Sequence, residues 1–329
     1  MTRVLRFHQH GTIDNLVLEE IPNRDPVGDE VLIKVDAFAL NRADIMFIDG
    51  DYTTSAILPS RLGSEVSGTV MAVGADVTRV VIGDRVGTIP FPGNNTYGVQ
   101  GETALVPEYV VTPTPVGLSS EEATSIWMQY LTAYFAFCEK VTLSAADVVF
   151  ISAASSSAGL GAIQLGKLLG VTTVAATRTP DKVDFLTDAG ADHVIISDEE
   201  DVATRLLDIT AGQGVRVAYD PVSGAYVGRY IGGMSAHGLI ILYGSLEKDR
   251  QLPRRQLYQK AINCYYYSMY NHVMDTAQLA RGKALIYGGI ATGQLRPIID
   301  RVFPLDQFRE AYRHLFSNTQ TGKIVVRVE

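Results

Sequence analysis

The feature that most constrains the fold of this chain is an alternation of short apolar runs and longer helical stretches, which begins near residue 121. The runs are Val148–Ile151, Val171–Ala176, His193–Ile196, Val215–Tyr219 and Leu239–Tyr243. Strands that are apolar on both faces and alternate with helices are typical of a parallel sheet covered by helices on both sides. Thr179 and Pro180 are typical of a helix start, and Gly190 of its end. The sequence therefore predicts an α/β domain with a doubly wound parallel sheet.

The regions before and after this alternating segment have a different pattern. Val31–Val35, Gly68–Gly74 and Asp84–Ile89 are short apolar runs separated by Gly and Pro, which favours a β-rich barrel or sandwich. A strand–helix–strand pattern from residue 297 to 328 is predicted to return to this region. We place the boundaries of the β-rich domain, the α/β domain and the final segment at 1–124, 125–266 and 267–329.

Composition excludes several classes of function. The net charge is −8 and no basic tract is present, which argues against nucleic-acid binding. No apolar run approaches the ~18 residues of a membrane helix. The start, Met1–Phe7, lacks the apolar core of a signal peptide, and the two cysteines, Cys138 and Cys264, cannot form a disulfide framework. We therefore predict a cytoplasmic protein without nucleic-acid or membrane partners.

The segment after the first apolar strand is a candidate phosphate loop. A dinucleotide-binding fold places G-x-G-x-x-G between its first strand and helix. Here the segment 154–159 keeps only the third glycine, where helix and strand pack closely. A helix N-terminus still offers free N–H groups to a pyrophosphate, and serines add hydroxyls. The candidate cofactor-binding residues are Ser155, Ser156, Ser157, Ala158 and Gly159. A serine-rich turn without a ligand is the alternative.

The next strand bears on the choice of cofactor. About 20 positions after the loop, NAD-binding folds carry an acidic residue that binds the ribose 2′-hydroxyl. This chain has Thr177 and Arg178 there, with Lys182 one helical turn later. A guanidinium binds a 2′-phosphate bidentately, whereas a carboxylate repels it. The sequence therefore predicts NADP(H) as cofactor, although a solvated arginine at a strand end is the other interpretation.

Five segments, taken in order, carry a resemblance to a known family. They are Asn41–Asp44 with Gly50–Tyr52, Leu62–Gly68, Gly83–Val86, Leu131–Tyr134 and Gly322–Val325. Together they resemble the quinone oxidoreductase branch of the medium-chain dehydrogenase/reductase superfamily, over nearly the whole chain. The resemblance implies a GroES-like catalytic domain over 1–124, a Rossmann NADP(H)-binding domain over 125–266, and a dimer-contact and return segment over 267–329. It also implies a homodimer with a site between the domains.

The resemblance also implies roles for individual residues. Asn41, Asp44 and Tyr52 would shape the nicotinamide end of the site, with Asp44 orienting its neighbours. Thr132 would lie at the nicotinamide, and Arg178 and Lys182 would hold the 2′-phosphate. Tyr243, Gly244 and Ser245 would pass under the nicotinamide ribose.

The positions that bind zinc in related dehydrogenases carry other residues here. Zinc-dependent relatives have Cys near position 41 and His after Gly63, whereas this chain has Asn41 and Ser64, which are poor zinc ligands. His8 and His10 share a strand face without an evident third ligand. We predict a metal-free protein that delivers hydride to an acceptor that is already electrophilic, such as a quinone or an α,β-unsaturated carbonyl. Solvent or Tyr52 would supply the proton.

A cluster of tyrosines lies near the end of the α/β domain. Strand alternation would place Tyr265 and Tyr267 on one face and Tyr266 on the other. One face would border a planar hydrophobic substrate and the other would pack at the dimer. An aromatic edge strand packed only for stability is the alternative.

Three functions follow, in order of preference. The first is an NADPH-dependent reductase of small planar or hydrophobic quinones or enones, without zinc. The second is an enoyl-thioester reductase, for which Arg250, Arg254 and Arg255 are candidate contacts to a carrier phosphopantetheine. The third, suggested by the altered glycine loop, is a non-catalytic NADP(H)-binding protein on the same scaffold.

Overall fold

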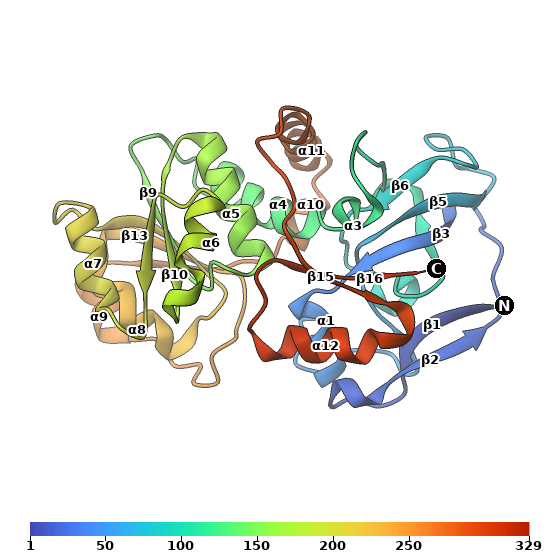
Figure 1. Cartoon of the computed structure of the whole chain (residues 1–329), viewed down its shortest axis with the longest axis horizontal. Coiled ribbons are helices and arrows are strands. Elements are labelled where there is room, and N and C mark those ends of the chain that lie inside the picture. Colours follow the sequence, from blue (N-terminus) through green and yellow to red (C-terminus); the bar gives the residue numbers. More distant parts are fainter. Residues whose placement is uncertain (329) are drawn as a thin grey trace. The chain divides into compact units, whose positions relative to one another are not determined.

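The computed structural model describes residues 1–328, which form two compact units (Figure 1). Unit 1 consists of residues 1–128 together with the segment from Pro297 onward, and unit 2 consists of Gln129–Arg296. The sequence predicts a boundary after residue 266, whereas residues 267–296 belong to unit 2. The reason is packing within that unit, since a Cβ on Gly282 would lie 2.9 Å from Leu131 and from Tyr134.

Unit 2 contains a six-stranded sheet in the order β11-β10-β9-β12-β13-β14, and every neighbouring pair is parallel. This confirms the predicted doubly wound sheet, to which β14 adds a sixth strand. The strand order reverses between β9 and β12, where parallel α/β sheets place their ligands. The strands are β9 Val148–Ile151, β10 Thr172–Thr177, β11 His193–Ile196, β12 Val215–Asp220, β13 Met234–Leu242 and β14 Asn263–Tyr266.

Helices of unit 2 cover both faces of this sheet. One face packs its apolar side chains against α7, α8 and α9, which Figure 1 shows beside one another, and α5 packs on β9 and β10. The helices are α5 Ser157–Leu169, α6 Val183–Asp188, α7 Val202–Ile209, α8 Val227–Tyr230, α9 Arg254–Lys260, α10 Tyr270–Val273 and α11 Thr276–Ala291. Helix α4 Trp127–Tyr134, followed by a π-helical turn over Phe135–Lys140, carries the chain from unit 1 into unit 2.

The predicted helix start after β10 is only partly correct. Pro180 opens a 3₁₀ turn, Pro180–Lys182, that leads into α6, and α6 ends two residues before Gly190. The Thr179 side chain does not cap this turn. Its hydroxyl donates to the Asp181 carboxylate instead, because that acceptor lies only two residues away.

Unit 1 is the β-rich domain. Strand β3 pairs antiparallel with β5, β7 and β16, so that β16 enters the sheet of the N-terminal segment. The strands are β1 Thr2–Phe7, β2 Leu16–Ile21, β3 Glu30–Ala39, β4 Ser60–Arg61, β5 Val66–Val73, β6 Arg85–Thr88, β7 Thr103–Pro107, β8 Val111–Pro113, β15 Ile299–Pro304 and β16 Lys323–Arg327. The helices are α1 Arg42–Asp49, α2 Asn94–Tyr97, α3 Ser120–Ala123 and α12 Phe308–Ser317. One apolar core, which includes Phe38, Phe47 and Tyr312, lies between these elements.

The pairing of β3 with β16 fixes the place of the candidate site in unit 1. The backbone N–H of Leu40 donates to the carbonyl of Ile324 over 3.0 Å, so the start of β16 lies beside the end of β3. The described helices include none with the length and apolarity that a membrane crossing requires.

Candidate functional site

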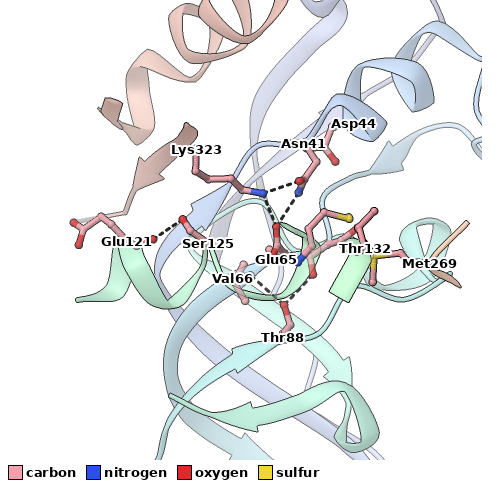
Figure 2. Close-up of polar contacts among 12 residues, drawn as sticks. Asn41, Asp44, Glu65, Val66, Thr88, Glu121, Ser125, Thr132, Met269 and Lys323 are labelled. Carbon is pink, nitrogen blue, oxygen red and sulfur yellow. Dashed lines mark hydrogen bonds and ion pairs between the residues drawn. The ribbon is translucent and has the colours of Figure 1, made fainter. Parts of the chain in front are cut away.

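Three side chains from separate parts of unit 1 meet at the start of α1 (Figure 2). Asn41 is the N-cap of α1, Glu65 precedes β5, and Lys323 opens β16. The Lys323 ammonium donates to Asn41 Oδ1 over 2.7 Å and to Glu65 Oε2 over 2.8 Å. Asn41 Nδ2 donates to the same Glu65 oxygen over 3.1 Å. The three groups form a closed triangle of hydrogen bonds, which we call the Asn41–Glu65–Lys323 triad.

The charged members of the triad are withdrawn from solvent. The side chains of Lys323 and Glu65 are 0% and 1% exposed. A buried charge is tolerated when it is paired and its remaining hydrogen-bonding capacity is met. The second carboxylate oxygen of Glu65 also has a hydrogen-bond donor, because Oε1 accepts from the backbone N–H of Met128 over 2.7 Å. That N–H lies in the first turn of α4, where the helix itself provides no acceptor.

Asp44 lies in the same buried region. Its Oδ2 accepts from the backbone N–H of Asn41 over 2.9 Å and from Gln100 Nε2 over 3.1 Å. Tyr312 donates in turn to Gln100 Oε1 over 2.7 Å. Burial raises the pKa of Asp44 to about 7. Asp44 thus connects the start of α1 with Gln100, and through Gln100 with Tyr312.

Gly63, two residues before Glu65, leaves room for the Gln100 side chain that contacts Asp44. Gly63 has φ +90°, and a Cβ there would lie 2.4 Å from Gln100 Cγ. The Gly-x-Glu turn therefore lets Gln100 reach Asp44.

Tyr52, the third predicted catalytic residue, is half-buried and packs edge-on against Phe47 at a centroid distance of 6.3 Å.

The candidate phosphate loop in unit 2 keeps its one essential glycine. A Cβ on Gly159 would lie 2.5 Å from the carbonyl oxygen of Ala154, so a larger residue would push the helix away from the strand. Ser156 is the N-cap of α5, and its Oγ accepts from the N–H of Gly159 over 3.1 Å. Ser155, Ser157 and Ala158 are partly exposed around this helix start. The loop is compact around a helix N-terminus despite the loss of two glycines.

The two candidate cations near β10 lie at different depths. Thr177 is buried at the end of β10 and Arg178, which follows it, is exposed. Lys182 is half-buried, and its ammonium donates to Ser155 Oγ over 3.2 Å. Lys182 therefore connects the segment after β10 with the phosphate loop. The nearest carboxylate in sequence, Asp181, is engaged by the Thr179 hydroxyl.

A buried carboxylate of unit 2 lies beside the candidate phosphate loop. Asp220, at the end of β12, accepts from Ser152 Oγ over 2.5 Å and from Tyr230 OH over 2.8 Å. It also accepts from the backbone N–H groups of Val222 and Ser223. Desolvation raises the pKa of Asp220, although its four donors oppose this. The carboxylate joins the end of β9, just before the loop, to the end of β12.

Aromatic side chains occupy the neighbouring strand ends. Tyr219 and Tyr243 stack at a centroid distance of 4.0 Å, and neither buried hydroxyl makes a hydrogen bond of normal geometry in the described structure. Gly244 must be small, because a Cβ there would lie 2.6 Å from the carbonyl oxygen of Pro221. Ser245 follows it and is half-buried.

The tyrosines at the end of β14 and directly after it alternate as predicted. Tyr266 is 70% exposed, whereas Tyr267 is buried and lies 6.1 Å from the Tyr265 ring. The Tyr267 hydroxyl donates to the carbonyl of Thr132 over 3.0 Å. Thr132 Oγ1 donates to the sulfur of Met269 over 3.4 Å (Figure 2). Thr132 is therefore held on two sides by the segment that follows the sheet.

The described residues include no group of three or more His, Cys, Asp or Glu side chains arranged to hold a metal ion. Of the two positions that are zinc ligands in zinc-dependent relatives, Asn41 is part of the triad. Ser64 lies 3.4 Å from Asn94 Oδ1, to which its hydroxyl donates.

Comparison with known proteins bears on the family. Residues 28–149 match the alcohol dehydrogenase GroES-like domain, and residues 158–282 match a domain described as zinc-binding dehydrogenase. The quinone oxidoreductase of Escherichia coli, solved in complex with NADPH, superposes with a TM-score of 0.90 at 26% identity, covering 99% of this chain and 100% of that one.

The chain belongs to the quinone oxidoreductase-like family of medium-chain dehydrogenases/reductases. Among members of this family, the quinone oxidoreductase of Pseudomonas aeruginosa is 27% identical over 99% of both chains. A phenolphthiocerol/phthiocerol polyketide synthase of Mycobacterium tuberculosis is 29% identical over 98% of this chain. The chain spans only 15% of the length of that synthase polypeptide.

Several residues of these clusters escaped the sequence analysis. Glu65 and Lys323 appeared only as parts of family-like segments, and Gln100, Tyr312 and Asp220 received no role. The position of Asp220 carried a usable signal, because a carboxylate at the end of an apolar strand in a parallel sheet lies at the ligand-binding edge. The other four gave no local pattern that distinguishes them from ordinary core or turn residues.

Proposed function

We propose that this protein is an NADPH-dependent oxidoreductase that delivers hydride to a quinone or an α,β-unsaturated carbonyl without zinc. The observation that carries the proposal is the set of cations beside the phosphate loop. Arg178 is exposed at the end of β10, Lys182 contacts Ser155, and the carboxylate of Asp181 is engaged elsewhere. The family and the NADPH complex of the Escherichia coli relative agree with this choice of cofactor.

The residues of unit 2 fit such a cofactor. The N-terminus of α5, with Ser155, Ser156 and Ser157, suits a pyrophosphate, since helix N–H groups and hydroxyls are donors. Arg178 suits the 2′-phosphate because its guanidinium forms paired hydrogen bonds with phosphate oxygens. Thr132, Ala158, Thr177, Tyr243, Gly244 and Ser245 are proposed to line the remainder of the cofactor site. When bound, NADPH supplies a hydride.

The acceptor chemistry is assigned to unit 1. A quinone or enone carbonyl gains negative charge on oxygen as it accepts hydride, so the protein must supply a hydrogen-bond donor and exclude water. Asn41 is the proposed donor, Asp44 orients it from the start of α1, and Tyr52 or solvent provides the proton. Independence from zinc is part of the proposal, and it is supported by Asn41 and Ser64 at the positions that hold zinc in other branches.

The proposal includes a homodimer formed through β14. This strand ends the sheet of unit 2, and an exposed strand edge with an aromatic side chain such as Tyr266 is suited to pairing. A dimeric state and a cytoplasmic location remain predictions from the sequence. The partner class is a small hydrophobic or planar electrophile.

The proposal is tested by measuring NADPH and NADH oxidation in parallel with 1,4-benzoquinone, a cyclic enone and crotonyl thioester. We expect NADPH to be preferred and the quinone or enone to be reduced. Preference for the thioester would favour the enoyl-thioester reductase, which the match to a polyketide synthase keeps under consideration. NADPH binding without turnover of any acceptor would favour a non-catalytic protein, and the absence of NADPH binding would refute the cofactor assignment.

A further inference from the structure

We infer that Glu65 and Lys323 are positioning residues that fix the side-chain amide of Asn41 in one orientation. The inference deepens the proposed function, on which its activity measurements rest. It is carried by three features of the triad: the pattern of hydrogen bonds around the amide, the depth at which each member lies, and the presence of a charge pair where an apolar core would suffice.

The hydrogen-bond pattern permits only one orientation of the amide. The oxygen and nitrogen of an asparagine side chain are similar in size, so burial alone does not distinguish the two orientations. In this structure Oδ1 faces the Lys323 ammonium, and Nδ2 faces the Glu65 carboxylate. Rotating the amide by half a turn would place its N–H groups against the ammonium and its oxygen against the carboxylate. Both contacts would become repulsive, so the ion pair acts as a lock.

The locked amide is the outermost member of the triad. Asn41 is 7% exposed, whereas Lys323 and Glu65 are almost completely enclosed. One N–H and one lone pair of the amide are used within the triad, which leaves one N–H with a fixed direction. A fixed donor needs no reorganisation as negative charge develops on an acceptor oxygen. The charges of Glu65 and Lys323 thus act on a substrate only through Asn41.

A purely structural role explains the pair less well. Replacing a buried ion pair with apolar residues of similar volume is often neutral or stabilising, so core packing alone gives little reason for two enclosed charges. An uncharged side chain satisfies buried backbone groups in the same region. Thr88 accepts from the N–H of Val66 and donates to the carbonyl of Ser64, each over 3.0 Å. Figure 2 shows Thr88 among the polar residues drawn near Glu65. Thr88 does not contact the Asn41 amide, which makes it a suitable control.

The test is a double-mutant cycle between Lys323 and Asn41. We expect Lys323→Met to lower kcat/KM for the quinone roughly tenfold to a hundredfold, as misplacement of a reacting group does, with the Kd of NADPH unchanged. In an Asn41→Ala background, the same change should lower kcat/KM less than twofold. Thr88→Val should lose stability but keep kcat/KM within twofold. Equal losses from Lys323→Met in both backgrounds would overturn the inference.

Two further measurements keep the test independent of folding and of the proposed function. If Lys323→Met does not fold, Glu65→Gln removes the carboxylate half of the lock while keeping the side-chain shape, and the same cycle with Asn41 applies. The side-chain amide signals of Asn41 in an NMR spectrum need no acceptor. We expect Lys323→Met or Glu65→Gln to raise their solvent exchange at least tenfold, and unchanged exchange would overturn the inference. A wild-type protein that reduces no acceptor would refute the proposed function alone.

Discussion

The polar cluster of unit 1 and the phosphate loop of unit 2 are built in opposite ways. The Asn41–Glu65–Lys323 triad is enclosed, charged and assembled from three distant segments. The loop and its cations come mostly from a short stretch of chain and remain partly exposed. The first arrangement derives its geometry from the fold, whereas the second derives it from local turn and helix structure. Changes in unit 1 should therefore affect stability and orientation together, and changes at Arg178 should affect affinity alone.

The largest effect is expected from breaking the ion pair. Lys323→Met should lower the free energy of unfolding by about 3–5 kcal/mol, because it leaves the Glu65 carboxylate buried without its cation. The double change Glu65→Leu with Lys323→Met should cost less than the sum of the single changes. Trp127, the single tryptophan, is buried in unit 1, so its fluorescence during urea unfolding reports on this unit.

The matched control is an ion pair at the surface of unit 2. Arg281 contacts Glu139 at 2.7 Å, but its side chain is 57% exposed. Arg281→Met should therefore lower the free energy of unfolding much less than Lys323→Met does, as circular dichroism in urea would show. A similar cost for both pairs would remove the contrast between the two units.

The next effect concerns Asp44 and pH. Its folded pKa, about 7, lies well above the ordinary value of about 3.9, so the folded state keeps a proton that the unfolded chain releases. The resulting stability is complete below pH ~4 and is lost as the pH rises through about 7, a loss on the order of a few kcal/mol. Asp44→Asn should flatten this slope in urea unfolding monitored through Trp127.

A carboxylate of the same unit gives the opposite sign. Burial opposes ionisation of Glu108, but backbone N–H groups of Arg79 and Thr78 and the Arg79 charge hold its pKa below the usual value. Its contribution is present at neutral pH and disappears as the pH falls through the folded pKa. Glu108→Gln should therefore destabilise unit 1 at pH 7 more than at pH 3. If the stability of Asp44→Asn and that of Glu108→Gln depended on pH in the same way, the raised pKa of Asp44 would be contradicted.

At the proposed cofactor site, a smaller and more selective effect is expected. Arg178→Ala should cost about 1–3 kcal/mol of NADPH affinity, the range for a charged hydrogen bond, with little change for NADH. The unfolding curve should not move, because Arg178 is exposed. Arg216→Ala is the control, since Arg216 pairs with Asp147 near the start of β12. Equal losses of NADPH and NADH affinity would refute the cofactor preference.

The smallest effect is expected at Tyr267, directly after β14. Tyr267→Phe removes the hydrogen bond to the carbonyl of Thr132 and should cost about 1 kcal/mol of stability. If the Tyr265–Tyr267 face borders the substrate, KM for a bulky quinone should rise, whereas the exposed Tyr266→Phe should leave it unchanged. Steady-state kinetics with a small and a large quinone separate these outcomes, and an unchanged KM in Tyr267→Phe would leave this tyrosine a structural role only.

The sequence predicted best where one short segment carries the whole signal. Val148–Ile151 has the predicted bounds because a buried parallel strand is a continuous apolar run, and His193–Ile196 also has the predicted bounds. Gly159 was recognised because its close approach to Ala154 is a local property of the strand–helix turn. Thr179 was assigned as a cap, but a nearby carboxylate competed for its hydroxyl, and propensity does not resolve such competition.

The Asn41–Glu65–Lys323 triad could not be predicted from the sequence, and the cause is physical. Nothing in the neighbourhood of Lys323 distinguishes it from a solvated lysine at the start of a strand. Its burial follows from the pairing of β16 with β3, and its partner Glu65 lies 258 positions away. The domain boundary after residue 266 was misplaced for a similar reason, because the packing of Gly282 on Leu131 joins segments that are distant in sequence.

The insertion of unit 2 between the two parts of unit 1 has a consequence for biosynthesis. During translation, Glu65 and Asn41 leave the ribosome long before Lys323, with all of Gln129–Arg296 made in between. Until β16 arrives, β3 lacks one neighbour and Glu65 lacks its cation. Unit 2 can complete its own sheet in that interval, since domains fold as units while the chain is being made. Unit 1 is therefore completed only after all of unit 2 has been made.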